Sequence, residues 1–212
     1  FLSGFPGSAG TLVVLPDSAA LWTDGRYFLQ ASQQLAGSGI ELMRMGEPGV
    51  PEIADFLRDH VEENGFIGFD SRTVSNAFAR TIGEKTREKH IRFAGGEDLV
   101  DLVWADRPAL SCEPVWTLDV KYTGLTRREK LAMVRGKMEE LGADVFVIPA
   151  LDEVAWLLNL RGGDVLYTPV FLSYLLLGRD QATLCVQKEA VSAEIEAQLK
   201  ADGVSLAPYD DI

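Results

Sequence analysis

Two glycine-rich corners, each followed by a strand–turn–strand pattern, constrain the fold of this chain more than any other feature of its sequence. Residues 156–164 join an apolar helix end to a pair of glycines, and an apolar run follows at 169–177. Residues 1–10 have the same character, with three glycines, and lead into an apolar stretch at 11–15. Such self-similarity indicates one structural unit used twice.

The repeat extends beyond the two corners. When Phe1 is placed over Trp156, predicted strands, turns and helices coincide in the same order in both halves. The matched pairs are strands 11–15 and 170–177, turns 17–18 and 179–180, strands 19–23 and 182–186, helices starting at Arg26 and Glu189, and strands 40–45 and 204–207. Few residues are identical, so chance similarity is the alternative to a true duplication.

The two halves differ in what surrounds the matched elements. The second half has a predicted helix and strand at 126–149 before its corner, whereas nothing precedes Phe1 in the first half. The first half continues with helix, strand, helix and strand through 51–94, and the second half has no such continuation. If the repeat is real, we expect this chain to be part of a longer protein.

Strands alternate with helices along the chain, which predicts an α/β fold. The predicted hairpins make the sheets mixed rather than purely parallel. Residues 107–122 contain two prolines and no clear period, which is typical of a linker. A helix that begins after Thr126, with Glu129 at the capping-box position, follows this linker. We therefore place a first domain at 1–120 and a second domain at 121–212.

Charge and composition exclude several classes of function. The net charge of −12 argues against a nucleic-acid partner, because phosphate contacts require a surplus of Lys and Arg. Solubility explains the acidity, and an acidic surface for basic peptides is the alternative. No apolar run has the length of a membrane-spanning helix. Cys112 and Cys185 suit reduced thiols in a cytoplasmic protein, with a disulfide between them as the alternative.

The residues of this chain predict no catalytic group and no metal ligand. Neither His60 nor His90 has a second histidine or a cysteine at ligand spacing. The HExxH, GxSxG, P-loop and GxGxxG patterns do not occur. We interpret both histidines as surface residues.

Arg161 and Asp164 are the charged residues that are hardest to explain by structure alone. They flank a glycine pair in an otherwise apolar region, where an unpaired charge is costly. One interpretation is a structural Arg–Asp ion pair that braces the corner, and the other is a role facing substrate or another domain. Gly4, Gly7 and Gly162 are expected where a side chain is costly, through a positive φ or a close approach.

Several long motifs resemble one known family. The first half contains SGFPGSAGT at 3–11 and LWTDGRYFLQA at 21–31, and the second half contains LDEVAWLLNLRGGDV at 151–165 and PVF at 169–171. DLVDLVW at 98–104, DRP at 106–108 and YTG at 122–124 also fit in order. Together they resemble the first two domains of three-domain aminopeptidase P, the Xaa-Pro aminopeptidase of the pita-bread metallopeptidases. The resemblance covers essentially the whole chain.

The resemblance implies two creatinase/prolidase N-terminal-like domains, each a three-layer α/β/α arrangement around a mixed sheet. The first would lack its leading helix and strand, and the second its trailing part. A separate catalytic domain would follow, with two divalent metal ions, commonly manganese, and would remove the N-terminal residue that precedes a proline. This chain alone would be inactive and hold no cofactor.

The resemblance also implies partners and site residues. The expected partners are the chain's own catalytic domain, proline-containing peptides and, as an option, a second copy of the protein. The corner that carries Arg161 and Asp164 would approach the catalytic site, which makes these two residues candidates for the substrate side.

Two further hypotheses compete with an enzyme part. The chain could belong to a catalytically inactive relative that uses this domain type to bind peptides or protein partners, which an acidic surface would suit. It could also be a self-standing scaffold. Five metal ligands downstream in the reading frame would favour the enzyme, and start and stop codons immediately around the chain would favour the scaffold.

Overall fold

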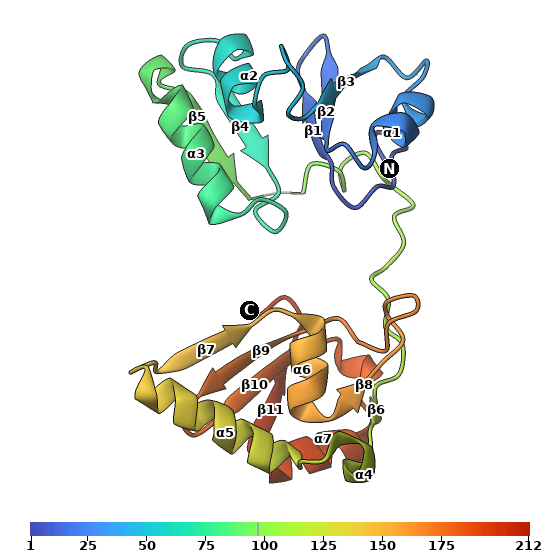
Figure 1. Cartoon of the computed structure of the whole chain (residues 1–212), viewed down its shortest axis with the longest axis vertical. Helices are drawn as coiled ribbons and strands as arrows, with labels where there is room; N and C mark the ends of the chain where they lie inside the picture. Colours follow the sequence, from blue (N-terminus) through green and yellow to red (C-terminus); the bar gives the residue numbers. More distant parts are fainter. Residues whose placement is uncertain (97) are drawn as a thin grey trace. The chain divides into compact units, whose positions relative to one another are not determined.

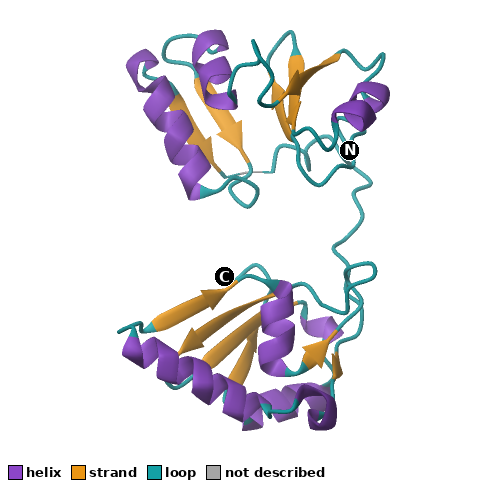
Figure 2. Ribbon diagram, viewed as in Figure 1, coloured by secondary structure: helices purple, strands orange, loops and turns teal. Residues whose placement is uncertain are grey.

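The structure is a computed structural model that describes residues 1–96 and 98–212. It divides into two compact units, unit 1 (Phe1–Pro108) and unit 2 (Ala109–Ile212). Each unit contains strands and helices of its own, as Figures 1 and 2 show. In the described part of the chain, no helix combines the length and apolar character that a membrane span requires.

Unit 1 combines short strands with helices between them, as the α/β prediction requires. Its strands are β1 (Thr11–Val14), β2 (Ala19–Thr23), β3 (Ile40–Arg44), β4 (Phe66–Phe69) and β5 (Arg92–Gly95). Its helices are α1 (Phe28–Gln34), α2 (Ile53–His60) and α3 (Asn76–Thr86), with the 3₁₀ helix η1 (Arg87–Lys89). One sheet has the order β1-β2-β3, and β4 pairs in parallel with β5.

Helices cover both faces of the β1-β2-β3 sheet. Successive residues of β2 point to opposite faces, so Trp22 and its neighbour Leu21 enter different cores. Trp22 packs with residues of α2 and α3, and its ring lies 4.8 Å from the Phe56 ring in an edge-on arrangement. Leu21 packs with Ala31 and Leu35 of the α1 segment. This alternation produces three layers around the sheet.

Unit 2 is built around one larger mixed sheet. Its strands are β6 (Trp116–Thr117), β7 (Val145–Ile148), β8 (Leu160–Arg161), β9 (Ser173–Gly178), β10 (Ala182–Val186) and β11 (Val204–Ala207). Its helices are α4 (Val120–Thr123), α5 (Arg127–Glu140), α6 (Leu151–Leu158) and α7 (Ala193–Ala201), with the 3₁₀ helix η2 (Lys188–Ala190). The main sheet has the order β11-β10-β9-β7, and β6 pairs with β8. The β1-β2-β3 sheet of unit 1 and the main sheet of unit 2 are both mixed, as predicted.

The main core of unit 2 lies on one face of this sheet. Along β9, residues alternate between buried and half-buried, and Leu175 and Leu177 are fully buried. Residues of α5, α6 and α7 share that core. Cys185 is buried and Cys112 is exposed, and both are free thiols, so the alternative of a disulfide between them is wrong.

The pairing of strands repeats between the units with the same register. β1 pairs antiparallel with β2 and β2 parallel with β3, just as β9 pairs antiparallel with β10 and β10 parallel with β11. Leu21 lies opposite Leu42 in unit 1, and Leu184 lies opposite Leu206 in unit 2. Placing Leu21 on Leu184 aligns all these pairs, which confirms the predicted repeat for the strands.

The boundary between the units, after Pro108, falls at the start of the linker predicted at 107–122. We expected residues 109–120 in the first domain, and the structure places them in unit 2. The reason is local packing: Val115 belongs to the unit 2 core, and its backbone N–H donates to the Ala190 carbonyl at 2.8 Å. Trp116 and Thr117 also pair with β8. A segment without helical or strand period is therefore held by specific contacts.

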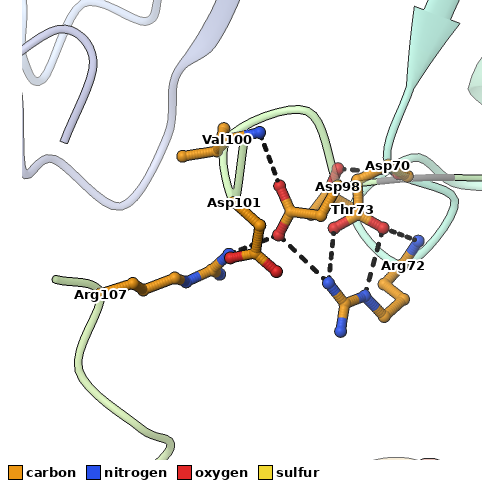
Figure 3. Close-up of polar contacts among 7 residues, drawn as sticks. All are labelled: Asp70, Arg72, Thr73, Asp98, Val100, Asp101 and Arg107. Atoms are coloured by element: carbon orange, nitrogen blue, oxygen red, sulfur yellow. Dashed lines mark hydrogen bonds and ion pairs between the residues drawn. The ribbon is translucent and has the colours of Figure 1, made fainter. Parts of the chain in front are cut away.

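A network of ion pairs holds the end of unit 1 to the loop after β4 (Figure 3). The Asp98 carboxylate accepts hydrogen bonds from Arg72, from Arg107 and from the Val100 backbone N–H. The Asp98 side chain is only 9% exposed. The bond to Val100 closes a turn, and a side chain that captures a nearby N–H competes with helix formation. Residues 99–103 accordingly form a turn.

Unit 1 is expected to lose stability in acid through this network. The Arg107 guanidinium, as the main cause, holds the pKa of Asp98 below its ordinary value, against the opposing effect of burial. A carboxyl whose folded pKa is depressed contributes stability above its unfolded pKa and loses it as the pH falls through the folded pKa. Asp98→Asn should therefore lower the melting temperature at neutral pH and reduce its decline below about pH 4.

The control for this prediction is Asp17→Asn, in the exposed turn between β1 and β2. The measurement is the unfolding of unit 1 by calorimetry between neutral and acidic pH. Equal pH profiles for the Asp98→Asn variant and the original chain would show that the network does not stabilise unit 1.

Candidate functional site

The candidate site is the corner at the end of α6. Val154, Leu157 and Leu158 are buried on the apolar side of this helix. The helix ends at Asn159, which has the left-handed φ of 54° and is 4% exposed. Asparagine is among the few residues that adopt this conformation at low cost, because its short side chain bonds locally. The corner thus forms at the end of an apolar helix, at a residue whose left-handed backbone lets the chain change direction.

Three cationic side chains bind backbone carbonyls at the end of α6. Lys130 Nζ donates to the Trp156 carbonyl at 2.8 Å, and Arg127 Nε donates to the Leu158 carbonyl at 2.8 Å. An Arg161 guanidinium N–H donates to the Ala155 carbonyl, also at 2.8 Å. The C-terminal end of a helix carries partial negative charge, so cations stabilise its carbonyls. The corner is therefore fixed from three directions.

Lys130 is an unusual member of this group because it is only 1% exposed. Its Nζ also donates to the Asn159 side-chain oxygen at 2.6 Å and lies 4.3 Å from the centre of the Trp156 ring. Burial, and secondarily the charge of Arg161, lowers the pKa of Lys130. The side chain thus joins α5 to the corner through hydrogen bonds rather than through an ion pair.

Arg161 and Asp164 do not form the structural ion pair that was one interpretation of the sequence. Arg161 is half-buried, and its two hydrogen bonds go to the Ala155 and Leu160 carbonyls. The backbone explains the difference, because the carbonyls at the end of α6 offer nearer acceptors for the guanidinium. The structure thus places both residues at the corner and gives them separate partners.

The Asp164 carboxylate braces the far side of the corner. One oxygen accepts from Ser111 Oγ at 2.7 Å and from the Glu113 backbone N–H at 2.9 Å, and the other accepts from the Leu172 N–H at 2.8 Å. Burial raises the pKa of Asp164, but these hydrogen bonds outweigh it and the net shift is downward. Asp164 therefore remains ionised at neutral pH and ties the 111–113 segment to the entrance of β9.

The structural glycines lie where the sequence analysis expected side chains to be costly. Gly4 has a φ of +66°, and a Cβ at Gly7 would overlap the Phe5 ring. A Cβ at Gly162 would lie 2.6 Å from the Phe171 Cβ and 3.2 Å from the Val170 carbonyl oxygen. Close approach, rather than a positive φ, is therefore the constraint at Gly162.

Gly162→Ala is expected to destabilise unit 2 by about 1–3 kcal/mol, because the added methyl group displaces Phe171 in a closely packed core. The control is Gly163→Ala, whose new Cβ would meet Glu113 at 3.4 Å, an ordinary contact, and should cost less than about 0.5 kcal/mol. Urea unfolding of both variants measures the difference. Equal midpoints would contradict the close approach at Gly162.

Beyond the corner, the chain forms a tight, exposed loop. Val165 and Thr168 form an isolated β-bridge, and the Thr168 N–H donates to the Val165 carbonyl at 3.1 Å. Between them, Leu166 is 78% exposed and Tyr167 is 96% exposed with a φ of 64°. An aromatic residue in this left-handed conformation is strained, and such strain persists only where the surroundings impose it.

Lys130, Asn159 and Tyr167 are not among the site residues predicted from the sequence. For Asn159 a signal existed, since asparagine after an apolar helical run is a recognised helix end. Lys130 lies beside the buried Leu131, and nothing in its residue type indicates burial. The strain at Tyr167 has no sequence signal, because tyrosine is not a turn-forming residue.

No metal site is visible in the part of the chain that the structure describes, where no group of three His, Cys, Asp or Glu side chains could hold an ion. His60 stacks on Phe56 at 3.9 Å and its Nδ1 lies 2.9 Å from the Phe56 carbonyl oxygen. His90 occupies a left-handed position after η1. The residues present therefore do not fit a metal centre.

The sequence profile of the creatinase/prolidase N-terminal domain matches residues 1–103, and a second profile with the same description matches residues 106–212. The chain belongs to the creatinase/prolidase N-terminal domain family. Units 1 and 2 each correspond to one creatinase/prolidase N-terminal domain, which confirms the resemblance inferred from the motifs.

Relatives with two such domains are similar over the whole of this chain. Aminopeptidase P2 of Arabidopsis thaliana is 43% identical over all of this chain and 30% of its own length. A probable Xaa-Pro aminopeptidase P of Neurospora crassa is 42% identical over all of this chain and 31% of its own length. The creatinase/prolidase N-terminal domains described here thus span about a third of these relatives and correspond to their N-terminal part.

A solved structure shows the same arrangement of elements. The X-prolyl aminopeptidase of Caenorhabditis elegans, described as a cytosolic enzyme with a di-nuclear active site, matches with a TM-score of 0.90 and 36% identity. The match covers 98% of this chain and 34% of the nematode protein. The nematode structure therefore contains counterparts of both creatinase/prolidase N-terminal domains.

Proposed function

We propose that this chain is the non-catalytic N-terminal part of an Xaa-Pro aminopeptidase, a metallopeptidase that removes an N-terminal residue preceding a proline. The observation that carries the proposal is the end-to-end match of two creatinase/prolidase N-terminal domains to a third of such enzymes. The described residues offer no set of metal ligands, which suits a supporting role.

The chemistry of the parent enzyme would lie outside this chain. Two divalent metal ions, with manganese as our proposal, would activate a water molecule there as the nucleophile. The di-nuclear site of the nematode relative supports two ions. Its description as a cytosolic enzyme also supports a cytoplasmic location for this protein.

The contribution of this chain would be to position groups around that centre. The corner of unit 2 is held by Lys130, Arg127 and Arg161 on one side and by Asp164 on the other. A loop anchored at both ends presents Leu166 and Tyr167 without further ordering on binding. We propose that this loop faces the catalytic domain or the substrate peptide, with Arg161 and Asp164 as positioning residues.

The test of this positioning role uses the longer enzyme with a proline-containing peptide. Tyr167→Ala should lower kcat/KM without changing the melting temperature, because the side chain is almost fully exposed. Arg161→Ala should also lower kcat/KM. It should lower the melting temperature only slightly. Normal kinetics for both variants would contradict a role of the corner on the substrate side.

A second candidate function is a peptide- or partner-binding module in a catalytically inactive relative. The net charge of −12 favours it, since an acidic surface attracts basic segments. The downstream reading frame distinguishes the two functions. A downstream catalytic domain with five metal ligands, two Asp, one His and two Glu, would support the enzyme. Loss of these ligands would support the binding module.

A further inference from the structure

The half-buried Arg161 side chain uses only one of its three nitrogens for contacts within the chain. Its Nη1 donates to the Ala155 carbonyl and to the Leu160 carbonyl, each at 2.8 Å. In the described part of the chain, Arg161 forms no ion pair and no other hydrogen bond. Among the described side chains, the one buried nitrogen without a partner is Arg135 Nη2, so Arg161 Nε and Nη2 are open to solvent. Three N–H donors of this guanidinium therefore lack a protein acceptor.

The free nitrogens form the edge of the guanidinium that matches a carboxylate. Nε and Nη2 present two parallel N–H groups, which bind both oxygens of a carboxylate at once. Arg26 uses this edge on Asp24, with distances of 2.9 Å and 2.7 Å to the two oxygens. Arg58 uses it on Asp59, at 2.8 Å and 3.1 Å. Arg161 presents the same edge without a carboxylate.

The free edge of Arg161 is held in place before any ligand arrives. Two carbonyls fix its Nη1, and Lys130 and Arg127 fix the end of α6 to which these carbonyls belong. A group that is already ordered loses little freedom on binding. The positive charge is also unbalanced here, because Lys130 donates to neutral oxygens, and burial and then the charge of Arg161 lower its pKa. A carboxylate at the free edge would relieve this repulsion.

An exposed aromatic residue lies beside Arg161. Trp116 is directly opposite Arg161 in the antiparallel pair of β6 and β8, so their side chains project from the same face. Trp116 is 47% exposed. Aromatic surfaces bind proline-containing segments, and the neighbouring cation adds an anchor for negative charge. The two residues together suit a ligand that has an apolar body and a carboxylate.

We propose that Arg161 binds a carboxylate of the peptide substrate through its Nε–Nη2 edge, with Trp116 beside it. The carboxylate is the free C-terminus of a short peptide or an acidic side chain that follows the proline. The proposal rests on the proposed function, because it requires the longer enzyme and its peptide substrate. It goes beyond that function in naming the binding atoms and the chemical group that they select.

Pairs of substrates that differ only in one carboxylate isolate this contact. The full protein is assayed with Xaa-Pro tripeptides, tetrapeptides and pentapeptides, each as the free acid and as the C-terminal amide. A second pair compares glutamate with glutamine after the proline, both as amides. The quantity measured is kcat/KM for the carboxylate peptide divided by kcat/KM for its uncharged partner. This ratio is insensitive to a loss of folded protein, which lowers both values equally.

The original protein should prefer the carboxylate peptide by about tenfold or more in at least one pair, the usual effect of a charge-assisted hydrogen bond. Arg161→Gln should bring that ratio close to one. Arg161→Lys should keep part of the preference, because an ammonium supplies the charge without the two parallel donors. The control is Arg179→Gln, which removes the same charge from an exposed arginine that pairs with Asp144 at 2.8 Å, and it should keep the full ratio.

Three results would overturn the proposal. The first is a ratio close to one for every pair in the original protein. The second is a preference that Arg161→Gln leaves unchanged, since another residue would then bind the carboxylate. The third is an equal fall of kcat/KM for both members of each pair, since Arg161 would then only hold the corner or bind a carboxylate of the enzyme itself. A preference in the terminal pairs identifies the C-terminus as the ligand, and one in the glutamate pair identifies the side chain.

The proposed function is tested separately from this contact. If the full protein hydrolyses none of these peptides, the proposed function fails, and calorimetric titration with the same peptide pairs decides the role of Arg161. Tighter binding of the carboxylate peptide that Arg161→Gln abolishes would support carboxylate recognition without hydrolysis. Equal dissociation constants within every pair, or no binding of any peptide, would contradict it.

Discussion

Phe171→Ala is expected to lower the free energy of unfolding of unit 2 by about 3–5 kcal/mol, the usual cost of removing a fully buried aromatic ring. Phe171 is 0% exposed and lies directly against Gly162. The cavity would form under the corner, so the loop that Asp164 and Arg161 hold should become mobile as well. Domain-resolved hydrogen exchange measures this, because the slowest amides of β9 and β10 report the unfolding of unit 2.

Two variants calibrate the effect. Phe171→Leu keeps most of the volume and should cost less than half as much as the alanine change. Leu166→Ala, at an exposed position of the neighbouring loop, should change stability by no more than about 0.5 kcal/mol. If Phe171→Ala also lowers the free energy of unfolding by no more than about 0.5 kcal/mol, the Phe171 ring does not stabilise the corner.

Asn159→Ala is expected to destabilise unit 2 by about 2–4 kcal/mol through two separable causes. The left-handed backbone, with a φ of 54°, disfavours alanine by about 1 kcal/mol. Loss of the side-chain oxygen also removes an acceptor from the buried ammonium of Lys130, and an orphaned buried donor costs about 1–3 kcal/mol. The Leu125 carbonyl loses one of two donors in the same change and keeps Thr123 Oγ1.

Asn64→Ala provides the matched control for this prediction. Asn64 has a similar φ of 59° but is exposed, so its replacement should show the backbone cost alone. The excess of the Asn159→Ala effect over the Asn64→Ala effect then measures the contact with Lys130. If urea unfolding gives the same loss for both variants, the buried hydrogen bonds do not stabilise the corner.

Much of the fold follows from the sequence because periodicity and turn residues specify it locally. The capping box at Thr126 and Glu129 forms as predicted and starts α5. The strand–turn–strand patterns that follow the two corners predicted two hairpins, and β1–β2 and β9–β10 form them. These signals are carried by residues close in sequence.

The parts that sequence reasoning missed depend on contacts between distant residues. Leu141, just after the end of α5, is 73% exposed, while the charged Lys130 is buried. Helical spacing alone does not show which carbonyls a lysine will meet from another element. The Asp164 contacts with Ser111 and Glu113 likewise span about fifty positions and decide where unit 2 begins.

We propose that this chain supports an Xaa-Pro aminopeptidase without carrying its chemistry. The most direct measurement compares hydrolysis of one Xaa-Pro peptide by residues 1–212 and by the full protein, each with added manganese. We expect turnover by the full protein and none above a buffer control by residues 1–212. Metal-dependent turnover that follows residues 1–212 through purification would contradict the account.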